Sequence, residues 1–182
     1  MRGVSSLLVV TGPPGSGKST LAPLVADHFD RSVLVQGDAF FAFVAKGAIE
    51  PWLREANAQN ETVTQAAAAA AGRYAVGGYT TVYDGLVGPW FLPTFLRASG
   101  LTSIDYVILL PSLDRCIQRV ATRLGHGFRD EDATRAMHGQ FVEAQMPERH
   151  FLVDPPEDPG EVADSILESF AGGLFRYPGT NG

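Results

Sequence analysis

The chain has 182 residues, of which 45% are hydrophobic and 19% charged, with a formal net charge of −6 and a single cysteine. These values are typical of one globular domain, and the acidic balance argues against binding to a nucleic-acid backbone or an anionic membrane. No apolar run approaches the ~20 residues that span a bilayer, and the four consecutive apolar residues before the glycine-rich loop are too few for a signal peptide. Cys116 has no disulfide partner, and the histidines lack the spacing of a metal cage. We therefore expect one domain over residues 1–182, in the cytoplasm, without nucleic-acid or membrane partners.

In the first half of the chain, short apolar runs alternate with apolar residues at helical spacing. The expected order is a strand over 5–12, a glycine-rich loop, a helix over 18–29, a strand over 32–38, and helices over 39–47, 51–59 and 61–78. The last of these helices has Asn60 as its cap and ends at Gly77-Gly78. Its six alanines, residues 66–71, would let it approach a neighbouring element closely.

The second half continues the alternation. We expect a strand over 79–87, a broken helical stretch over 88–99, a strand over 104–111, a helix over 112–123, a loop over 124–132, a helix to about 149, a strand over 150–154, a helix over 160–175 and a frayed tail over 176–182. This alternation predicts an α/β fold, in which a parallel sheet carries helices on both faces. Ligands of such sheets bind beyond the carboxyl ends of the strands, where Asp38 and Asp84 lie.

A phosphate-binding loop follows the first predicted strand. Residues 12–19, GPPGSGKS, match GxxxxGK[ST] between a strand and a helix. The glycines let backbone N–H groups point inward at phosphate oxygens, and the helix that begins there adds the positive end of its dipole. Lys18 can reach the β- and γ-phosphates, and the Ser19 hydroxyl can bind Mg²⁺. The predicted nucleotide-binding residues of the loop are Gly12, Gly15, Ser16, Gly17, Lys18, Ser19 and Thr20.

Such a loop serves many enzymes, and the rest of the chain narrows the choice. The sequence has no NKxD guanine signature, and 182 residues leave no room for the coupling elements of a motor. With Asp38, VYDG at 82–85 and the arginine-bearing helix after LLP at 109–111, the loop resembles the small P-loop kinases, in the group that contains chloramphenicol phosphotransferase, zeta-toxin, gluconate kinase and shikimate kinase. The resemblance covers essentially the whole chain. It implies a P-loop NTPase three-layer sandwich, with a five-stranded parallel sheet of order 2-3-1-4-5 and a short lid.

Arg115, Arg119 and Arg123 are spaced four residues apart, on one face of the predicted helix. The resemblance implies a mobile lid over about 123–131, whose arginines meet the transferring phosphate, as arginine's planar fork suits. Arg123 would contact phosphate, with Arg129 and then Arg135 as further candidates. Arg119 would stack on adenine, with Pro155 in the other wall of the slot. We expect Arg115 on the surface.

Two carboxylates complete the expected site. In the resembling sugar and antibiotic kinases a carboxylate at the position of Asp38 faces the acceptor hydroxyl, where it accepts the proton or aligns the oxygen. A second role, compatible with the first, is to cap the helix over 39–47. Asp84 ends the third strand, where it can hold Mg²⁺ through water or bind substrate.

Residues 39–77 are expected to cover the acceptor. They and their neighbours supply several aromatic side chains, most of which we expect in the core, although a partly apolar acceptor would also explain them: Phe40, Phe41, Phe43, Trp52 and Trp90. The cations available for an anionic acceptor are Arg54, Arg73 and Arg97.

We therefore expect an ATP- and Mg²⁺-dependent kinase that transfers the γ-phosphate to a hydroxyl of a small molecule, of antibiotic or sugar type. Its catalytic residues would be Lys18, Asp38, Arg123 and Arg129. One alternative is a nucleoside or nucleotide kinase. Another, from a different class, is a regulatory protein that binds nucleotide and hydrolyses ATP slowly.

Overall fold

A six-stranded sheet runs through the middle of the protein, whose computed structural model describes residues 6–122 and 128–178. The strands are β1 Leu7–Thr11, β2 Ser32–Gln36, β3 Thr80–Asp84, β4 Ser103–Leu110, β5 Phe151–Val153 and β6 Arg176–Pro178. The first five are parallel and follow the order β2-β3-β1-β4-β5, which confirms the predicted topology. This order places the carboxyl ends of β2 and β3 beside the loop that follows β1.

The short strand β6 was not predicted, because residues 176–182 were expected to be frayed. It pairs antiparallel with the first residues of β4. Arg176 fixes this pairing: its Nη1 donates to the Ser103 hydroxyl at 2.9 Å, and its Nη2 lies 3.7 Å from the buried Asp105 carboxylate. The stabilising contacts are distant in sequence, so local composition gave no sign of them.

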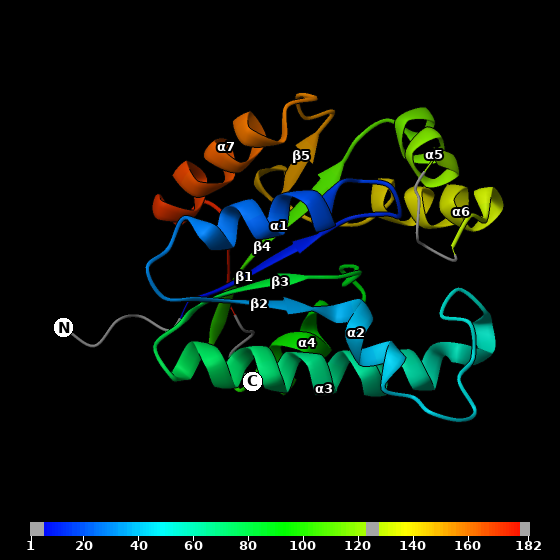
Figure 1. Ribbon diagram of the computed structural model, residues 1–182, viewed down its shortest axis with the longest axis horizontal. Helices are drawn as coiled ribbons and strands as arrows, with labels where there is room; N and C mark the ends of the chain where they lie inside the picture. Colours follow the sequence, from blue (N-terminus) through cyan, green and yellow to red (C-terminus); the bar gives the residue numbers. More distant parts are fainter. Residues whose placement is uncertain (1–5, 123–127, 179–182) are drawn as a thin grey trace.

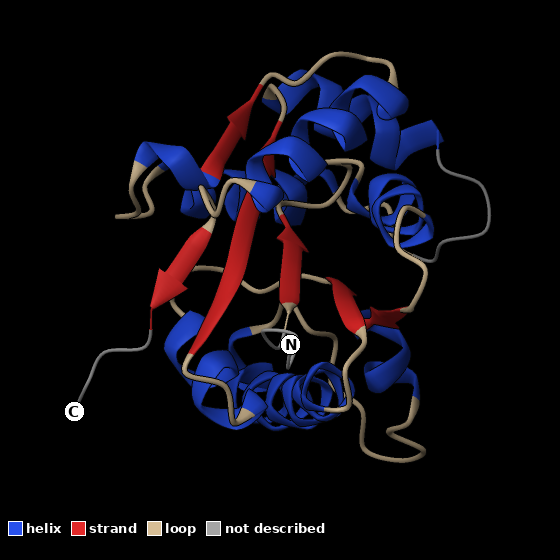
Figure 2. Cartoon of the chain, turned by 90° about the vertical axis from the view of Figure 1, so that its left-hand side faces the viewer, coloured by secondary structure: helices blue, strands red, loops and turns tan. Residues whose placement is uncertain are grey.

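Helices cover both faces of the sheet (Figures 1 and 2). α1 Lys18–Asp27 and α7 Pro159–Ala171 lie on one face, and α3 Asn57–Val76 and α4 Leu92–Ser99 on the other. Each pair encloses its own core of buried apolar residues against the strands. α2 Gly37–Ala42, α5 Leu113–Thr122 and α6 Glu131–Val142 lie toward the carboxyl ends of the strands, with the short 3₁₀ turns η1 Arg54–Ala56 and η2 Glu148–His150.

The alanine-rich helix α3 packs closely on α4, as predicted. Its buried face is made of small residues, among them Ala67, Ala68 and Ala71. Gly72 meets α4 so closely that an added Cβ would collide with the carbonyl oxygen of Ser99. Small side chains on one face therefore bring the two helix backbones together.

Several predicted helix boundaries were wrong. α2 ends at Ala42 rather than 47, and residues 51–59 form only η1 and the start of α3. Asn60 lies inside α3 instead of capping it, and its Nδ2 donates to the Pro51 carbonyl at 2.7 Å. α6 ends at Val142 rather than near 149. Short helices gain most of their stability from burying one face. Phe43, after the end of α2, and Val142, at the end of α6, are both exposed, so further turns at these ends would bury little apolar surface.

Candidate active site

The loop between β1 and α1 curls in a way that depends on its glycines. Gly12, Gly15 and Gly17 have φ angles of 150°, 77° and 100°, in a region that residues with side chains rarely adopt. A Cβ at Gly12 would also collide with the Leu109 carbonyl, and one at Gly15 with the Cys116 carbonyl. The loop therefore packs backbone against backbone on β4 and α5.

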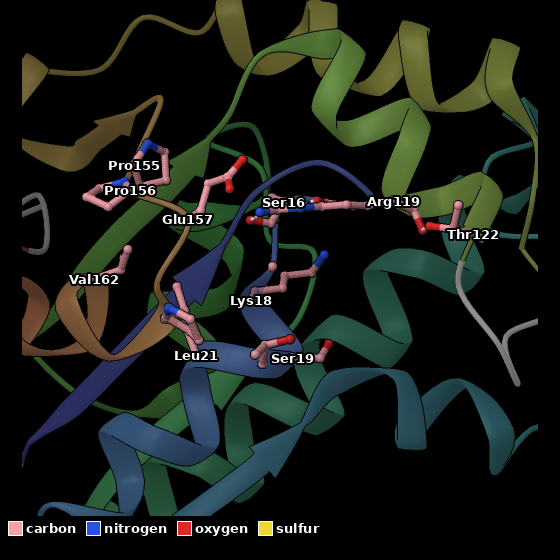
Figure 3. A pocket seen from close by; sticks show the side chains of 14 residues that line it. Ser16, Lys18, Ser19, Leu21, Arg119, Thr122, Pro155, Pro156, Glu157 and Val162 are labelled. Carbon is pink, nitrogen blue, oxygen red and sulfur yellow. Dashed lines mark hydrogen bonds between the residues drawn. The ribbon is translucent and has the colours of Figure 1, made fainter.

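The polar side chains of this loop differ in exposure. Ser16 is buried in the loop at 2% exposure, whereas Ser19 and Thr20 are exposed in the first turn of α1. Lys18 is half-buried, and its ammonium donates to the Pro13 carbonyl at 3.4 Å, so the side chain lies back over the loop (Figure 3). The amino end of α1 and the lysine thus bring positive charge to one place, as an anion site requires.

A cavity of about 320 Å³ opens on this loop. Residues 15–21 form its floor, Arg119 and Thr122 of α5 form one side, and Pro155, Pro156 and Glu157 after β5 form the other (Figure 3). The Arg119 Nη1 donates to the carbonyls of Gly15 and Ser16, both at 3.4 Å. The structure therefore brings the phosphate loop, Arg119 and Pro155 together around one cavity.

Arg115 is only partly at the surface, where it was predicted to lie. It is half-buried, and its Nη1 donates to the Pro155 carbonyl at 2.9 Å. Its position one turn before Arg119, on the same face of α5, was the signal in the sequence that it belongs with the cavity. Sequence reasoning missed it because its partner is a backbone carbonyl, which no motif reveals.

Asp84 and Asp38 end neighbouring strands beside the loop. Asp84 is the last residue of β3, is 6% exposed, and lies in register with Val10 of β1 and Gln36 of β2. Asp38 is exposed in the first turn of α2. It does not cap this helix, because Gln36 occupies the N-cap position, so the predicted capping role was wrong.

Both carboxylates lie within electrostatic reach of the Tyr83 phenol. Burial raises the pKa of Tyr83 well above its usual value, and the negative charges of Asp38 and Asp84 raise it further. The phenol therefore stays neutral, with a carboxylate near it at the end of β3 and another just past the end of β2.

The remaining arginines are not all gathered at this edge. Arg123 and most of the expected lid lie outside the described residues. Arg129 is exposed just before α6, and Arg135 pairs with Glu131 at 3.0 Å on the exposed side of that helix. Arg73 and Arg97 lie near the last turns of α3 and α4, which lead into the amino ends of β3 and β4, so neither can face an acceptor at the carboxyl edge. Arg54, in η1, precedes α3 on the carboxyl side.

Three of the five aromatic side chains expected mostly in the core are exposed instead. Phe43 is 73% exposed, Trp90 44% and Trp52 38%, whereas Phe40 and Phe41 are half-buried. The Trp52 ring contacts that of Phe128, with ring centres 4.9 Å apart, and so joins the segment before η1 to the segment before α6. Aromatic surface is therefore available beside α2 and its neighbours.

Comparison with known proteins identifies the family. Residues 7–147, more than half of the chain, match the AAA_33 family, described as an AAA domain. The chain belongs to this family. A 40-residue stretch is 45% identical to an adenylate kinase from Nocardioides sp., but it covers only 22% of this chain and 21% of that protein. The chain thus matches about a fifth of the length of this curated relative.

Solved structures show that the AAA_33 chain has the fold of the P-loop kinases. An unliganded sugar kinase from Janibacter sp. superposes with a TM-score of 0.67 at 22% identity, covering 91% of this chain and 94% of that one. The APS kinase CysC of Mycobacterium tuberculosis, in complex with AMPPNP and APS, gives 0.66 at 17% identity over 91% and 97%. A tunicamycin resistance protein from Deinococcus radiodurans gives 0.64 at 15% identity over 95% and 98%.

Within residues 6–122 and 128–178, no group of three or more His, Cys, Asp and Glu side chains is placed to hold a metal ion. None of the helices in these ranges has the length and apolarity needed to cross a bilayer.

Proposed function

We propose that this protein is an ATP-dependent kinase that transfers the γ-phosphate to a hydroxyl group of a small molecule, as a single domain over residues 1–182. The observation that carries the proposal is the shared edge: the phosphate loop after β1 lies beside Asp84 of β3 and Asp38 after β2. A protein that only bound nucleotide would need the phosphate loop but would have no use for Asp38. Asp38 is exposed two residues past the end of β2, and its carboxylate can face an acceptor.

The residues of the loop would bind and orient the phosphates. The backbone N–H groups from about Gly15 to Thr20 and the Lys18 ammonium would hold the phosphate oxygens. Adenine would lie in the cavity between Arg119 and Pro155, which are on opposite sides of it. The proposed roles of Arg123 and Arg129 are to neutralise charge on the transferring phosphoryl group.

A Mg²⁺ ion fits the donors present. The Ser19 hydroxyl and the Asp84 carboxylate supply hard oxygen ligands at the edge of the loop, and Mg²⁺ is commonly held by one or two protein groups together with phosphates and water. When bound, the ion would offset negative charge that develops on the phosphate oxygens. Asp38 would accept the proton of the acceptor hydroxyl or align its oxygen with the γ-phosphate.

An antibiotic-like or sugar-like acceptor is favoured. Structures of similar fold include a sugar kinase and a tunicamycin resistance protein. The exposed rings of Phe43 and Trp52 flank the segment between α2 and η1, which belongs to the proposed acceptor cover over 39–77. Aromatic faces suit an acceptor that is partly apolar, and Arg54 is a nearby cation for an anionic one.

The deciding experiment is a screen of ATP consumption against a panel of sugars, antibiotics, nucleosides and nucleotides, each measured with and without the compound. Stimulation by a sugar or antibiotic, with phosphate recovered on that compound, supports the proposal. Stimulation by nucleosides or nucleotides alone would make the protein a nucleotide kinase, the reading that the short match to an adenylate kinase favours. A flat basal rate across the panel would favour a regulatory protein.

The matched control for the screen is Lys18→Ala. This variant should lose transfer and bind ATP more weakly while remaining folded, because the lysine is only half-buried and its bond to Pro13 is long. Normal turnover by Lys18→Ala would contradict the assignment of the phosphate loop.

A further inference from the structure

Helix α5 is hydrogen-bonded both to the Pro155 side of the cavity and to its floor. At its start, the Ser112 N–H donates to the Asp154 carboxylate at 2.6 Å. One turn on, the Arg115 Nη1 donates to the Pro155 carbonyl at 2.9 Å, and a further turn on, Arg119 binds carbonyls of the phosphate loop. One face of a single helix is therefore hydrogen-bonded to the turn after β5 and to the phosphate loop.

The turn after β5 needs this support. Asp154 has a φ of 43°, a left-handed conformation that residues other than glycine seldom adopt. Its N–H donates to the Leu110 carbonyl at 3.0 Å, but the direction of the following Pro155 depends on the bonds from α5. Pro155 has no backbone N–H, so its carbonyl is its only backbone group that can form a hydrogen bond.

Arg115 also carries an unexplained donor. Its Nη2 is buried and has no hydrogen-bond partner among the described residues. Burying a guanidinium nitrogen without a hydrogen-bond partner costs stability. An apolar side chain could pack in the same place without this cost. The feature that the arginine does provide is the bond to the Pro155 carbonyl.

We propose that Arg115 is a positioning residue that fixes the Pro155 side of the cavity and thereby sets the affinity for the base of a nucleotide, separately from its phosphates. The inference rests on the proposed function in that the cavity takes a nucleotide. A base held between Arg119 and Pro155 depends on the spacing of these two residues. Phosphate binding depends on the loop, and the hydrogen bonds of Arg115 go to Ser112 and Pro155 instead.

The test compares two ligands in each variant: ATP and inorganic tripolyphosphate, titrated by calorimetry with Mg²⁺ present. In Arg115→Met the Kd for ATP should rise about ten-fold, the scale of one lost charge-assisted hydrogen bond, while that for tripolyphosphate stays within about two-fold. Arg115→Lys should keep most of the ATP affinity, because an ammonium can still donate to the Pro155 carbonyl. Arg31→Met, at an exposed arginine before β2, is the control and should change neither value.

The ratio of the two affinities separates positioning from damage to the fold. Partial unfolding of Arg115→Met would weaken both ligands equally, and an equal loss would overturn the proposal, as would unchanged binding of ATP. The proposed function fails in a different way: the wild-type protein would bind ATP but transfer phosphate to no compound in the screen, and the comparison of ATP with tripolyphosphate would still stand.

Discussion

At the scale of single residues, the two carboxylates at the ends of β2 and β3 have different environments. Asp84 is buried between β1 and β2, whereas Asp38 is exposed and makes no capping bond. A buried carboxylate beside the phosphate loop suits a fixed ligand, and an exposed one suits a group that meets an incoming hydroxyl. The difference in burial therefore assigns them different proposed roles.

We expect Asp38→Asn to lower the rate of transfer by about 10²-fold or more, the usual scale for a lost general base, with ATP affinity nearly unchanged. The substitution keeps the size of the side chain and removes its charge and proton affinity. Steady-state kinetics with the acceptor found in the screen, together with ATP titration, measures both effects. Asp84→Asn is the matched variant and should raise the Mg²⁺ concentration needed for activity as well as lower the rate. Near-normal turnover by Asp38→Asn would remove Asp38 from the chemistry.

At the scale of secondary-structure elements, the sequence predicted what local patterns encode. The apolar runs gave the five parallel strands, and GPPGSGKS gave the turn between β1 and α1. The strand order came from the resemblance to P-loop kinases, because spacing alone does not order strands. β6, the contact of Arg115 with Pro155 and the exposed position of Trp52 depend on partners far along the chain, which no local pattern contains.

The packing of α3 on α4 gives a pair of glycine substitutions with opposite expected signs. Gly72→Ala should lower the free energy of unfolding by about 1–3 kcal/mol, since the new methyl group collides with the Ser99 carbonyl. Gly139→Ala, inside α6 with open space around the position, should raise it by about 0.5–1 kcal/mol through better helix propensity. Urea denaturation measures both. An unchanged or increased stability of Gly72→Ala would show that α3 and α4 can separate without cost.

At the scale of the whole molecule, one buried cluster lies away from the cavity and couples stability to pH. His150 is fully buried at the end of η2, beside Tyr106 of β4 and Tyr177 of β6. Its Nδ1 donates to the Tyr106 carbonyl at 2.8 Å, so Nε2 carries no proton, and this buried nitrogen has no partner among the described residues. Burial lowers the pKa of His150 from its usual 6.5, and the charge of Arg149 lowers it further, against the opposing effect of the bond to Tyr106.

His150 should therefore make the protein less stable as the pH falls below about 6.5. Between the lowered pKa and 6.5 the unfolded chain binds a proton that the folded protein does not, so the free energy of unfolding rises with pH there, by at most about 1.4 kcal/mol per pH unit for one group. This contribution is complete above 6.5 and is lost as the pH falls toward the lowered pKa. Burial raises the pKa of the nearby Asp105, which has the opposite effect, but Asp105 is present in every variant compared.

The measurement is urea denaturation of the wild type, His150→Gln and His28→Gln between pH 7.5 and 5.5. Subtracting the His150→Gln curve from that of the wild type isolates the contribution of His150, which should shrink as the pH is lowered. His28 lies exposed at the end of α1, and its variant should follow the wild type. If the free energies of unfolding of the wild type and His150→Gln changed with pH in parallel, the imidazole would bind its proton equally well in the folded and unfolded chain. That result would contradict a buried Nε2 that has no hydrogen-bond partner in the described part of the chain.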